Sequence, residues 1–209
     1  MIRIALAKGK LFDEAIGLYD RAGLPVPEEI RQSRKLHVSD EKHSRAFLAV
    51  RAQDVPTYVS QGAADVGIVG RDVLLEQGSD LYQLLDLRIG FCRLVLAAKD
   101  ASVMAKNGTI RVATKYPNVT RSFFMGKGRA CSVIKLYGSV ELAPQAMLAD
   151  AVVDLVSTGE TLRANGLVIL EEILQSTGLL VVNRVSLKMN KSAIEGMISS
   201  LQSVLPPAP

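Results

Sequence analysis

The segment DAVVDLVSTGETLRANG, Asp150–Gly166, joins an apolar run to a helical pattern through a loop of small and polar residues. The run AVVDLV is typical of a buried strand, and the residues after STGET are typical of a helix. A strand that leads into a helix leaves unpaired backbone N–H groups at the helix start, and these groups attract anions. Gly159 lets the backbone approach a ligand closely, because it has no Cβ. The segment therefore indicates α/β structure with an anion-binding loop.

The same alternation of apolar runs and helical patterns extends along the chain. The strand-like runs are IRIALA, RAFLAV and VGIVG in the first half and TIRVAT, SVIKLYG and AVVDLV in the second. Helical patterns separate them, including LAPQAMLA at residues 142–149. This order predicts an α/β fold with mixed, largely parallel sheets.

Two extended crossings divide the chain into lobes. GFCRLVLAAK, residues 90–99, leaves the first half, and GLLVVNRV, residues 178–185, returns to it. We expect residues 1–90 and 184–209 to form a first lobe and residues 91–183 to form an inserted second lobe. Such a layout predicts a ligand cleft between the lobes.

A weak internal repeat supports the two-lobed layout. DVGIVGRDVL, which starts at Asp65, aligns without gaps with DLVSTGETL, which starts at Asp154. The alignment places Gly70 opposite Gly159. Chance matches of this quality are common, so the repeat predicts only that each lobe has an acid, a strand, a glycine loop and a helix in this order.

The loop has the residue types that a sugar phosphate needs. Ser157, Thr158 and Thr161 add hydroxyl donors to the backbone donors around Gly159, which suits a terminal phosphate. Asp154 cannot bind a phosphate, but its carboxylate can accept hydrogen bonds from sugar hydroxyls. Together they predict a ribose 5-phosphate site, although a plain helix-capping turn is the simpler alternative. The loop matches neither a P-loop nor a Rossmann fingerprint.

Composition excludes several classes of protein. Aromatic residues make up 5% of the 209 residues, Trp is absent, and the net charge is only +4, which argues against a nucleic-acid binder. The apolar run before Lys8 is too short for a secretory signal, and no run is long enough to span a membrane. The two cysteines have no metal-ligand or redox spacing. We therefore expect a cytoplasmic protein with no nucleic-acid or membrane partner.

Basic residues gather in one stretch of the first lobe. They are Arg31, Arg34, Lys35, Lys42, Arg45 and Arg51, with His37 and His43 among them. Such a stretch is either a solvated face or an electrostatic funnel for a small anionic substrate.

Three stretches resemble the ATP phosphoribosyltransferases, the first enzymes of histidine biosynthesis. ELAPQAMLADAVVDLVSTGETL, from Glu141, resembles the phosphoribosyl-diphosphate signature of that family, with Met147 where the family usually has glycine. LAKGKL resembles the family's Leu-Pro-Lys-Gly-Arg motif, with Ala7 and Lys10 as departures. RAQDVPTYVSQGAADVGIVGRDVL is similar to a first-lobe segment of the family. The resemblance covers nearly the whole chain.

The resemblance implies a fold, a reaction and a partner. The fold is two-lobed, of the periplasmic-binding-protein type (type II). In the reaction, a ring nitrogen of the adenine of ATP attacks the anomeric carbon of phosphoribosyl diphosphate, and phosphoribosyl-ATP and pyrophosphate form. The chain is similar to the short form of the family, which is expected to form a hetero-oligomer with a separate regulatory subunit that resembles histidyl-tRNA synthetase.

The resemblance also implies roles for individual residues. The phosphoribosyl-diphosphate set is Glu141, Asp154, Ser157, Thr158, Gly159, Glu160 and Thr161. The ATP set comes from positions at strand ends: Lys8, Gly9 and Lys10 follow the first predicted strand, and Arg51, Gly70 and Asp72 lie at predicted strand ends in the first lobe. We expect Lys8, Glu141 and Asp154 to be catalytic, the two acids by stabilising a cationic sugar through its hydroxyls or the metal. Magnesium is the expected partner of the diphosphate, with its ligands and any general base unassigned.

Two rival functions fit part of the sequence. A non-catalytic two-lobed binding module would need no reaction at the loop. A phosphoribosyltransferase that acts on a free base would have a similar loop, so STGET alone does not exclude it. For Arg51, Gly70 and Asp72, an ordinary surface charge or turn is an equally good interpretation.

Overall fold

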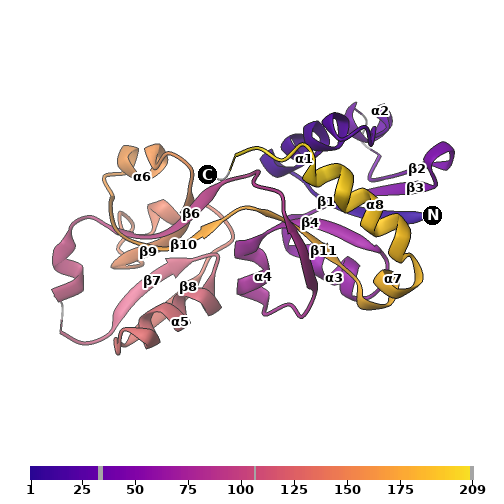
Figure 1. Cartoon of the computed structure of the whole chain (residues 1–209). Helices are drawn as coiled ribbons and strands as arrows, with labels where there is room; N and C mark the ends of the chain where they lie inside the picture. The colour runs from indigo at the N-terminus through magenta and orange to yellow at the C-terminus, as the bar shows by residue number, and fades with distance from the viewer. Residues whose placement is uncertain (33–34, 106, 208–209) are drawn as a thin grey trace. The chain divides into compact units, whose positions relative to one another are not determined.

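The computed structural model describes residues 1–32, 35–105 and 107–207, so Arg34 of the basic stretch lies outside the described residues. The chain forms two compact units (Figure 1). Unit 1 consists of Met1–Leu74, Gly78–Phe91 and Thr177–Pro209, and unit 2 consists of Leu75–Gln77 and Cys92–Ser176. The chain thus returns to unit 1 at Thr177, before the expected boundary at residue 184.

Unit 1 is built on a mixed six-stranded sheet with the order β2-β3-β1-β4-β11-β5. Its strands are β1 (Ile2–Ala7), β2 (His37–Asp40), β3 (Arg45–Val50), β4 (Val66–Gly70), β5 (Tyr82–Asp86) and β11 (Gly178–Val182). β1 runs parallel to β3 and β4, while β2 and β11 pair antiparallel with their neighbours. β11 pairs with both β4 and β5, which explains why the return to unit 1 comes earlier than expected.

Helices cover both faces of the unit 1 sheet. They are α1 (Lys10–Arg21), α2 (Glu28–Gln32), α3 (Val55–Ser60), α4 (Arg71–Gln77), α7 (Arg184–Met189) and α8 (Lys191–Gln202), with short 3-10 turns η1 (Glu41–His43) and η2 (Ala52–Asp54). Side chains of α1 and α8 pack on one face, and those of α3 and α4 pack on the other. Figure 1 shows these two pairs of helices on opposite sides of the strands.

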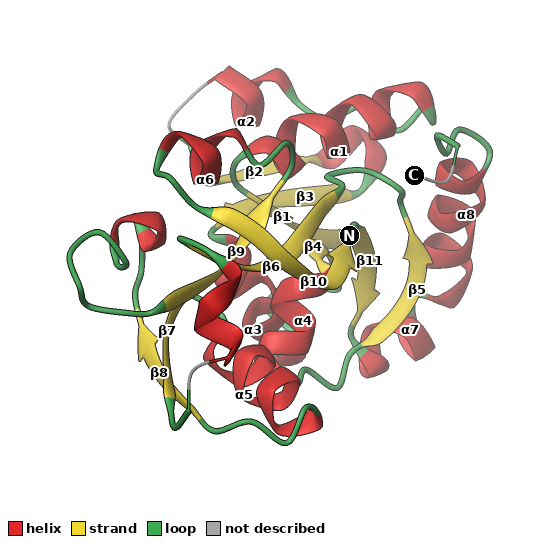
Figure 2. Cartoon of the chain, turned by 90° about the vertical axis from the view of Figure 1, so that its left-hand side faces the viewer, coloured by secondary structure: helices red, strands yellow, loops and turns green. Residues whose placement is uncertain are grey.

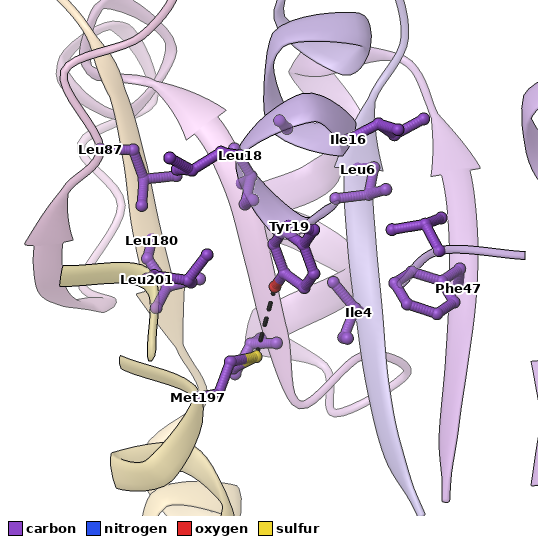
Figure 3. Close-up of a cluster of buried hydrophobic side chains, with 14 of the residues drawn as sticks. Ile4, Leu6, Ile16, Leu18, Tyr19, Phe47, Leu87, Leu180, Met197 and Leu201 are labelled. Atoms are coloured by element: carbon purple, nitrogen blue, oxygen red, sulfur yellow. Dashed lines mark hydrogen bonds between the residues drawn. The ribbon is translucent and has the colours of Figure 1, made fainter. Parts of the chain in front are cut away.

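The face under α1 and α8 holds the larger core (Figure 3). Tyr19 of α1 lies against Phe47 of β3 edge to face, with 6.3 Å between ring centroids. The Tyr19 hydroxyl donates to Met197 Sδ of α8 at 3.3 Å, so the buried hydroxyl has a partner. Burial of each such large side chain contributes roughly 1.5–3 kcal/mol. The C-terminal helix is therefore part of the same core as the first strand.

Unit 2 is built on a mixed five-stranded sheet with the order β10-β6-β9-β7-β8 (Figure 2). Its strands are β6 (Cys92–Ala98), β7 (Ile110–Thr114), β8 (Cys131–Lys135), β9 (Ala151–Val156) and β10 (Val168–Ser176). Its helices are α5 (Pro117–Gly126) and α6 (Glu160–Ala164), with 3-10 turns η3 (Ala101–Ala105) and η4 (Val140–Leu142). β7 is parallel to β8 and β9, whereas β6 is antiparallel to β9 and β10.

The helix predicted for residues 142–149 does not form. A 3-10 turn ends at Leu142, and the chain continues in turns to β9. Met147 adopts a left-handed φ of 56°, and the next amide, Leu148 N, closes back onto Ala143 O at 2.9 Å. Ala143 and Ala149 are buried while Met147 and Leu148 are exposed, so the apolar residues do not share one helical face. The prediction of a helix here was wrong because the segment folds into turns, with the left-handed Met147 among them.

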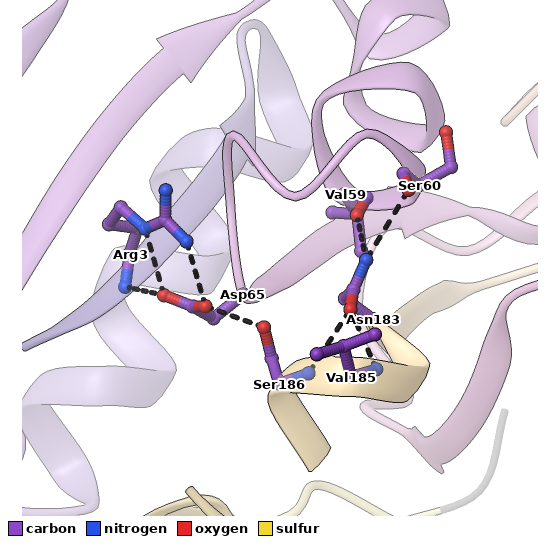
Figure 4. Close-up of polar contacts among 7 residues, drawn as sticks. All are labelled: Arg3, Val59, Ser60, Asp65, Asn183, Val185 and Ser186. Atoms are coloured by element: carbon purple, nitrogen blue, oxygen red, sulfur yellow. Dashed lines mark hydrogen bonds and ion pairs between the residues drawn. The ribbon is translucent and has the colours of Figure 1, made fainter. Parts of the chain in front are cut away.

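An arginine and an aspartate join the two central parallel strands of unit 1 (Figure 4). Arg3 of β1 donates from its backbone N at 2.8 Å and from Nε at 3.0 Å to Asp65 Oδ2, and from Nη2 at 3.0 Å to Oδ1. The backbone N of Asp65 donates back to Arg3 O at 2.8 Å. Ser186 Oγ of α7 adds a bond of 2.6 Å to Asp65 Oδ1. The buried Asp65 thus ties two strands and a helix together.

Unit 2 repeats this arrangement between β7 and β9. Arg111 donates from N at 2.8 Å and from Nε at 3.3 Å to Asp150 Oδ2, and from Nη2 at 3.1 Å to Oδ1. Asp150 N donates to Arg111 O at 2.8 Å. Asp65 directly precedes β4 and Asp150 directly precedes β9, so the structural counterpart of Asp65 is Asp150. The ungapped alignment of Asp65 with Asp154 was therefore wrong.

Candidate functional site

One cavity in unit 2 collects the whole residue set predicted for phosphoribosyl diphosphate. Its volume is about 210 Å³, and it lies where β9 ends and α6 begins. Its lining is Glu141, Asp154, Leu155, Val156, Ser157, Thr158, Gly159, Glu160, Thr161 and Leu162. All seven predicted residues are present, since η4 brings Glu141 to the end of β9.

The loop between β9 and α6 has a backbone suited to an anion. Gly159 has a left-handed φ of 77°, a conformation that glycine adopts without steric cost. The N–H groups of Ser157, Thr158 and Gly159 donate to no acceptor in the described ranges 1–32, 35–105 and 107–207. These three donors are free to bind a ligand oxygen, because Ser157 and Thr158 are exposed and Gly159 lines the cavity.

Asp154 is a half-buried acid at the wall of this cavity. Burial raises the pKa of Asp154, and the nearby charge of Glu141 adds to the rise. The backbone N–H of Leu155 and the charge of Lys115 act in the opposite direction on the same pKa, but the net change is upward. A carboxylate held this way is costly to ionise, and it gains from any hydrogen-bond donor that a ligand brings.

Lys115 is a charged neighbour of the site that the sequence-based prediction missed. It directly follows β7, and β7 lies beside β9 with Thr114 opposite Val153. Lys115 follows Thr114 and Asp154 follows Val153, so these two residues come opposite each other. The local signal was a lysine directly after a predicted strand, the same signal that singled out Lys8.

Lys8 and Gly9 line a separate cavity in unit 1. Its volume is about 290 Å³, and its lining is Lys8, Gly9, Phe12, Asp13, Ile30, Arg31, Lys35, Leu36 and Ala49. The cavity combines cationic side chains from the loop after β1 and from the basic stretch with apolar walls from Phe12 and Ile30. Such a mixture suits a ligand with an apolar ring and anionic groups.

The other four residues predicted for ATP do not line this cavity. Lys10 Nζ lies 3.7 Å from Glu14 Oε1, one turn along α1. Arg51 is exposed at the start of η2, and Gly70 ends β4. Asp72 of α4 is buried, with 5% of its surface exposed. The structure thus gathers the unit 2 set completely and the unit 1 set only in part.

Neither a metal centre nor a membrane segment is evident in the described residues. In residues 1–32, 35–105 and 107–207, no three His, Cys, Asp or Glu side chains are grouped in a way that could hold a metal ion. Within the same residues, every helix is too short or too polar to cross a bilayer.

Sequence comparison places the chain among known proteins. A family model described as ATP phosphoribosyltransferase matches residues 51–203. A relative from Acidithiobacillus ferrooxidans with the name ATP phosphoribosyltransferase is 50% identical over 212 residues, which is 99% of this chain and 98% of the relative. One from Thermoanaerobacter sp. with the same name is 49% identical, over 98% of this chain and 96% of the relative.

Solved structures agree with the sequence comparison. The ATP phosphoribosyl transferase (HisG:HisZ) complex from Thermotoga maritima contains a chain with a TM-score of 0.84 and 36% identity, covering 97% of this chain and 98% of that chain. The periplasmic aliphatic sulphonate binding protein SsuA from Escherichia coli gives a TM-score of 0.61 at 16% identity, covering 97% and 71%. This second likeness bears on the fold alone, and it confirms the expected type II periplasmic-binding-protein fold.

Proposed function

The chain belongs to the ATP phosphoribosyltransferase family of histidine biosynthesis, and from this premise we propose that unit 2 binds phosphoribosyl diphosphate and unit 1 binds ATP. In the reaction, a bond forms between a ring nitrogen of adenine and the anomeric carbon. The bond from that carbon to the diphosphate oxygen breaks, and pyrophosphate leaves with the electron pair. The proposal assigns each cavity one of the two substrates.

One observation carries the assignment of unit 2: a single cavity combines free backbone donors with sugar-binding acids. The N–H groups of Ser157, Thr158 and Gly159 are proposed to bind the 5-phosphate, with the hydroxyls of Ser157, Thr158 and Thr161 as further donors. Hydrogen bonds to a charged acceptor contribute about 1.5–3 kcal/mol each, so two or three suffice to orient the substrate. We call these backbone and hydroxyl donors of residues 157–161 the phosphate cradle. An ordinary helix-capping turn needs no such set of donors around a cavity.

Asp154 and Glu141 are proposed to face the sugar. An ionised carboxylate is an acceptor only, and ribose hydroxyls are donors, so the two groups are complementary. Positive charge develops on the sugar as the diphosphate leaves, and nearby carboxylates stabilise it most where water is excluded. Asp154 is half-buried on the cavity wall, so part of its surface is already shielded from water. Glu160 is proposed to bind the same substrate from the start of α6.

The unit 1 cavity supports the ATP assignment of Lys8 and Gly9. A lysine is a point charge suited to phosphate oxygens, and the apolar walls suit an adenine ring. Arg31 and Lys35 also line the cavity, but Arg31 donates to both carboxylate oxygens of Asp20, and Asp13 adds a negative charge to the lining. The assignment of Lys10, Arg51, Gly70 and Asp72 to ATP rests on their positions at or just after the ends of β1, β3 and β4.

Magnesium is proposed to arrive with the diphosphate. Magnesium prefers oxygen ligands and keeps several waters, so substrate phosphates can supply most of its remaining ligands. When bound, it neutralises charge on the leaving pyrophosphate. We assign it no ligand from this chain, in keeping with the missing carboxylate cluster in the described residues.

The proposal extends to assembly and location. The solved structure most informative here is described as a HisG:HisZ complex, and this supports a regulatory partner for this chain. We propose a hetero-oligomer with a subunit that resembles histidyl-tRNA synthetase, in the cytoplasm, with no nucleic-acid or membrane partner. The mildly basic charge of +4 agrees with small anionic substrates as the ligands.

The direct test mixes the chain with ATP, phosphoribosyl diphosphate and magnesium, with and without the regulatory subunit. Formation of the nucleotide adduct and release of pyrophosphate are measured in the same sample. Both are expected in equal amounts in at least one of the two conditions. Ribose 5-phosphate in place of phosphoribosyl diphosphate is the matched control, because it lacks the leaving group.

Two outcomes would contradict the proposal. Pyrophosphate release with adenine but not with ATP would favour a free-base transferase. Substrate binding with no reaction in either condition would favour a binding module.

A further inference from the structure

The inference concerns Lys115, the lysine that follows β7 beside the proposed phosphoribosyl-diphosphate cavity. We propose that Lys115 is a positioning residue that holds Asp154 charged and in place while the ribose hydroxyls bind. This inference rests on the proposed function of the unit 2 cavity. It assigns a task to a residue outside both substrate sets.

The strand register places the two side chains next to each other. β7 and β9 are parallel, with Val112 opposite Ala151 and Thr114 opposite Val153. One residue further along each strand brings Lys115 opposite Asp154. Adjacent strands lie roughly 4.8 Å apart, which is within the reach of a lysine side chain.

Side-chain alternation puts both residues on the same face of the sheet. On β9, Val152 and Val156 belong to the core cluster that includes Val140 and Leu162, and Asp154 has the same parity. On β7, Ala113 belongs to that cluster, and Lys115 has the same parity. The alternate residues of both strands, such as Val112 and Val153, belong to the core cluster on the opposite face of the sheet. Lys115 is half-buried, so part of its charge is shielded from solvent.

The other charged residues that line the cavity of Asp154 are negative, while α6 brings Arg163 Nη1 to 4.0 Å from the position of a Cβ on Gly159. Glu141 on η4 and Glu160 at the start of α6 line the same cavity, and β6 places the apolar Val95 opposite Asp154. Burial and Glu141 raise the pKa of Asp154, and Lys115 is the cation that opposes this rise. A substrate with several phosphate charges would raise that pKa further. Without Lys115, Asp154 would more readily take up a proton and lose its capacity as an acceptor.

Lys115 therefore affects the substrate indirectly, by keeping the Asp154 carboxyl ionised. A protonated Asp154 is a donor at one oxygen, and it no longer matches two ribose hydroxyls. The removal of a nearby cation raises the pKa of a carboxyl by about one unit or more when the two lie within 4–6 Å. The expected result is a loss of activity at the acid end of the pH range, with less change at high pH where Asp154 ionises without help.

The experiment uses the full chain with its regulatory subunit and compares K115M, K115R and K135M. Lys135 ends β8, the strand next to β7, and it stacks on Tyr137, so K135M removes the same charge from the same edge of the sheet away from Asp154. The pH profile of kcat/KM for phosphoribosyl diphosphate is measured at saturating ATP and magnesium. We expect the acid limb of K115M to move up by about one pH unit. K115R and K135M are expected to stay near the wild type.

A second measurement does not depend on turnover. NMR titration of the Asp154 carboxyl carbon in the free chain, assigned with D154N, is expected to show the same upward shift in K115M only. An Asp154 titration unchanged in K115M, or equally changed in K135M, would overturn the inference. If the wild type forms no phosphoribosyl-ATP, the proposed function fails, and the carboxyl titration still decides whether the pair exists.

Discussion

The two units begin their central strands in the same way and end them differently. In both, an aspartate directly before the strand binds the backbone and guanidinium of an arginine on the neighbouring strand. In unit 1, β4 ends at Gly70 and α4 starts at Arg71 with no residue between them. In unit 2, three residues, Ser157–Gly159, separate β9 from α6. The start of the strand is thus shared framework, and the end is where the units diverge.

The divergence decides which unit has free backbone donors. In unit 1, the N–H of Arg71 is already bound to Thr177 O at 3.0 Å. In unit 2, the N–H groups of Ser157–Gly159 have no acceptor among the residues that the structure describes. A short insertion after the strand can therefore turn a plain strand-to-helix junction into an anion site, without any change to the paired strands beneath it.

The largest expected effect is that of Gly159→Asp. The new carboxylate would lie in the proposed phosphate cradle, and the loss of two charge-assisted hydrogen bonds would raise KM for phosphoribosyl diphosphate about 1,000-fold. Gly166→Asp is the matched control, since Gly166 also has a left-handed φ, of 68°. Steady-state kinetics and thermal melting of both variants make the test. Equal KM values for the two variants would show that the loop after β9 does not bind the phosphate, and the proposed difference between the units would fail.

The second effect tests the shared framework. Asp65→Asn should lower the free energy of unfolding by about 3 kcal/mol, because it breaks a pair whose acid is buried. Asp150→Asn should cost about 1 kcal/mol, since the Asp150 side chain is 13% exposed against 5% for Asp65. The two variants are compared by urea denaturation and, separately, by native-state hydrogen exchange of the β1 and β7 amides. Equal losses would show that the clamps are equivalent.

The pH dependence of stability follows from the same pair. Burial acts to raise the pKa of Asp65, but the hydrogen bonds from Arg3 and Ser186 outweigh burial and hold the pKa below its usual value. The contribution is therefore present above the ordinary Asp pKa of about 3.9, and it is lost as the pH falls through the lower folded value. Melting temperatures of the wild type and Asp65→Asn should converge in that acid range. A constant difference at all pH values would contradict this.

Met147→Gly is expected to stabilise unit 2 by about 1 kcal/mol. Met147 has a left-handed φ of 56° and an exposed side chain, so glycine relieves strain and gives up little packing. Met189 is equally exposed but ends the helix α7, so Met189→Gly should destabilise by a similar amount. Urea denaturation of both variants measures the pair. A loss of stability in Met147→Gly would show that the methionine side chain has a contact of its own.

The smallest expected effect is on the stability of Asp154→Asn. The pKa of Asp154 is raised chiefly by burial, so its ionisation costs stability as the pH rises from the ordinary Asp pKa through the higher folded value. Asparagine should therefore raise the melting temperature at pH 7, and the gain should vanish toward the ordinary Asp pKa of about 3.9. Activity should fall in the same variant. A lower melting temperature at pH 7 would mean that Asp154 supports the fold as Asp65 does.

The sequence was most informative where the site is local. Asp154 and the STGET loop lie within one short segment, so one strand-loop-helix pattern was enough to predict their meeting. The apolar stripe of α1 was predictable for the same reason, since helical periodicity places Ala15, Ile16 and Tyr19 on one buried face.

Contacts that depend on register across strands escaped the prediction. Lys115 comes opposite Asp154 only because β7 pairs with β9 in a particular register, and no local sequence pattern predicts that register. The match of Asp65 to Asp150 was missed because the longer loop of unit 2 shifts an ungapped alignment. The residues predicted for ATP in unit 1 do not all line one cavity. Lys8 and Arg51, for example, follow different strands, and the directions of their side chains depend on packing.

The position of β11 has a consequence for how the chain is made. β11 lies between β4 and β5, and it pairs antiparallel with both of them. On the ribosome, all of unit 2 emerges before this strand, so it can collapse while β4 and β5 still expose open edges. Open edges invite pairing with other chains. Emergence of residues Gly178–Val182 from the ribosome is therefore the step that covers these two edges, after which β5 keeps only its outer edge, as the last strand of the sheet.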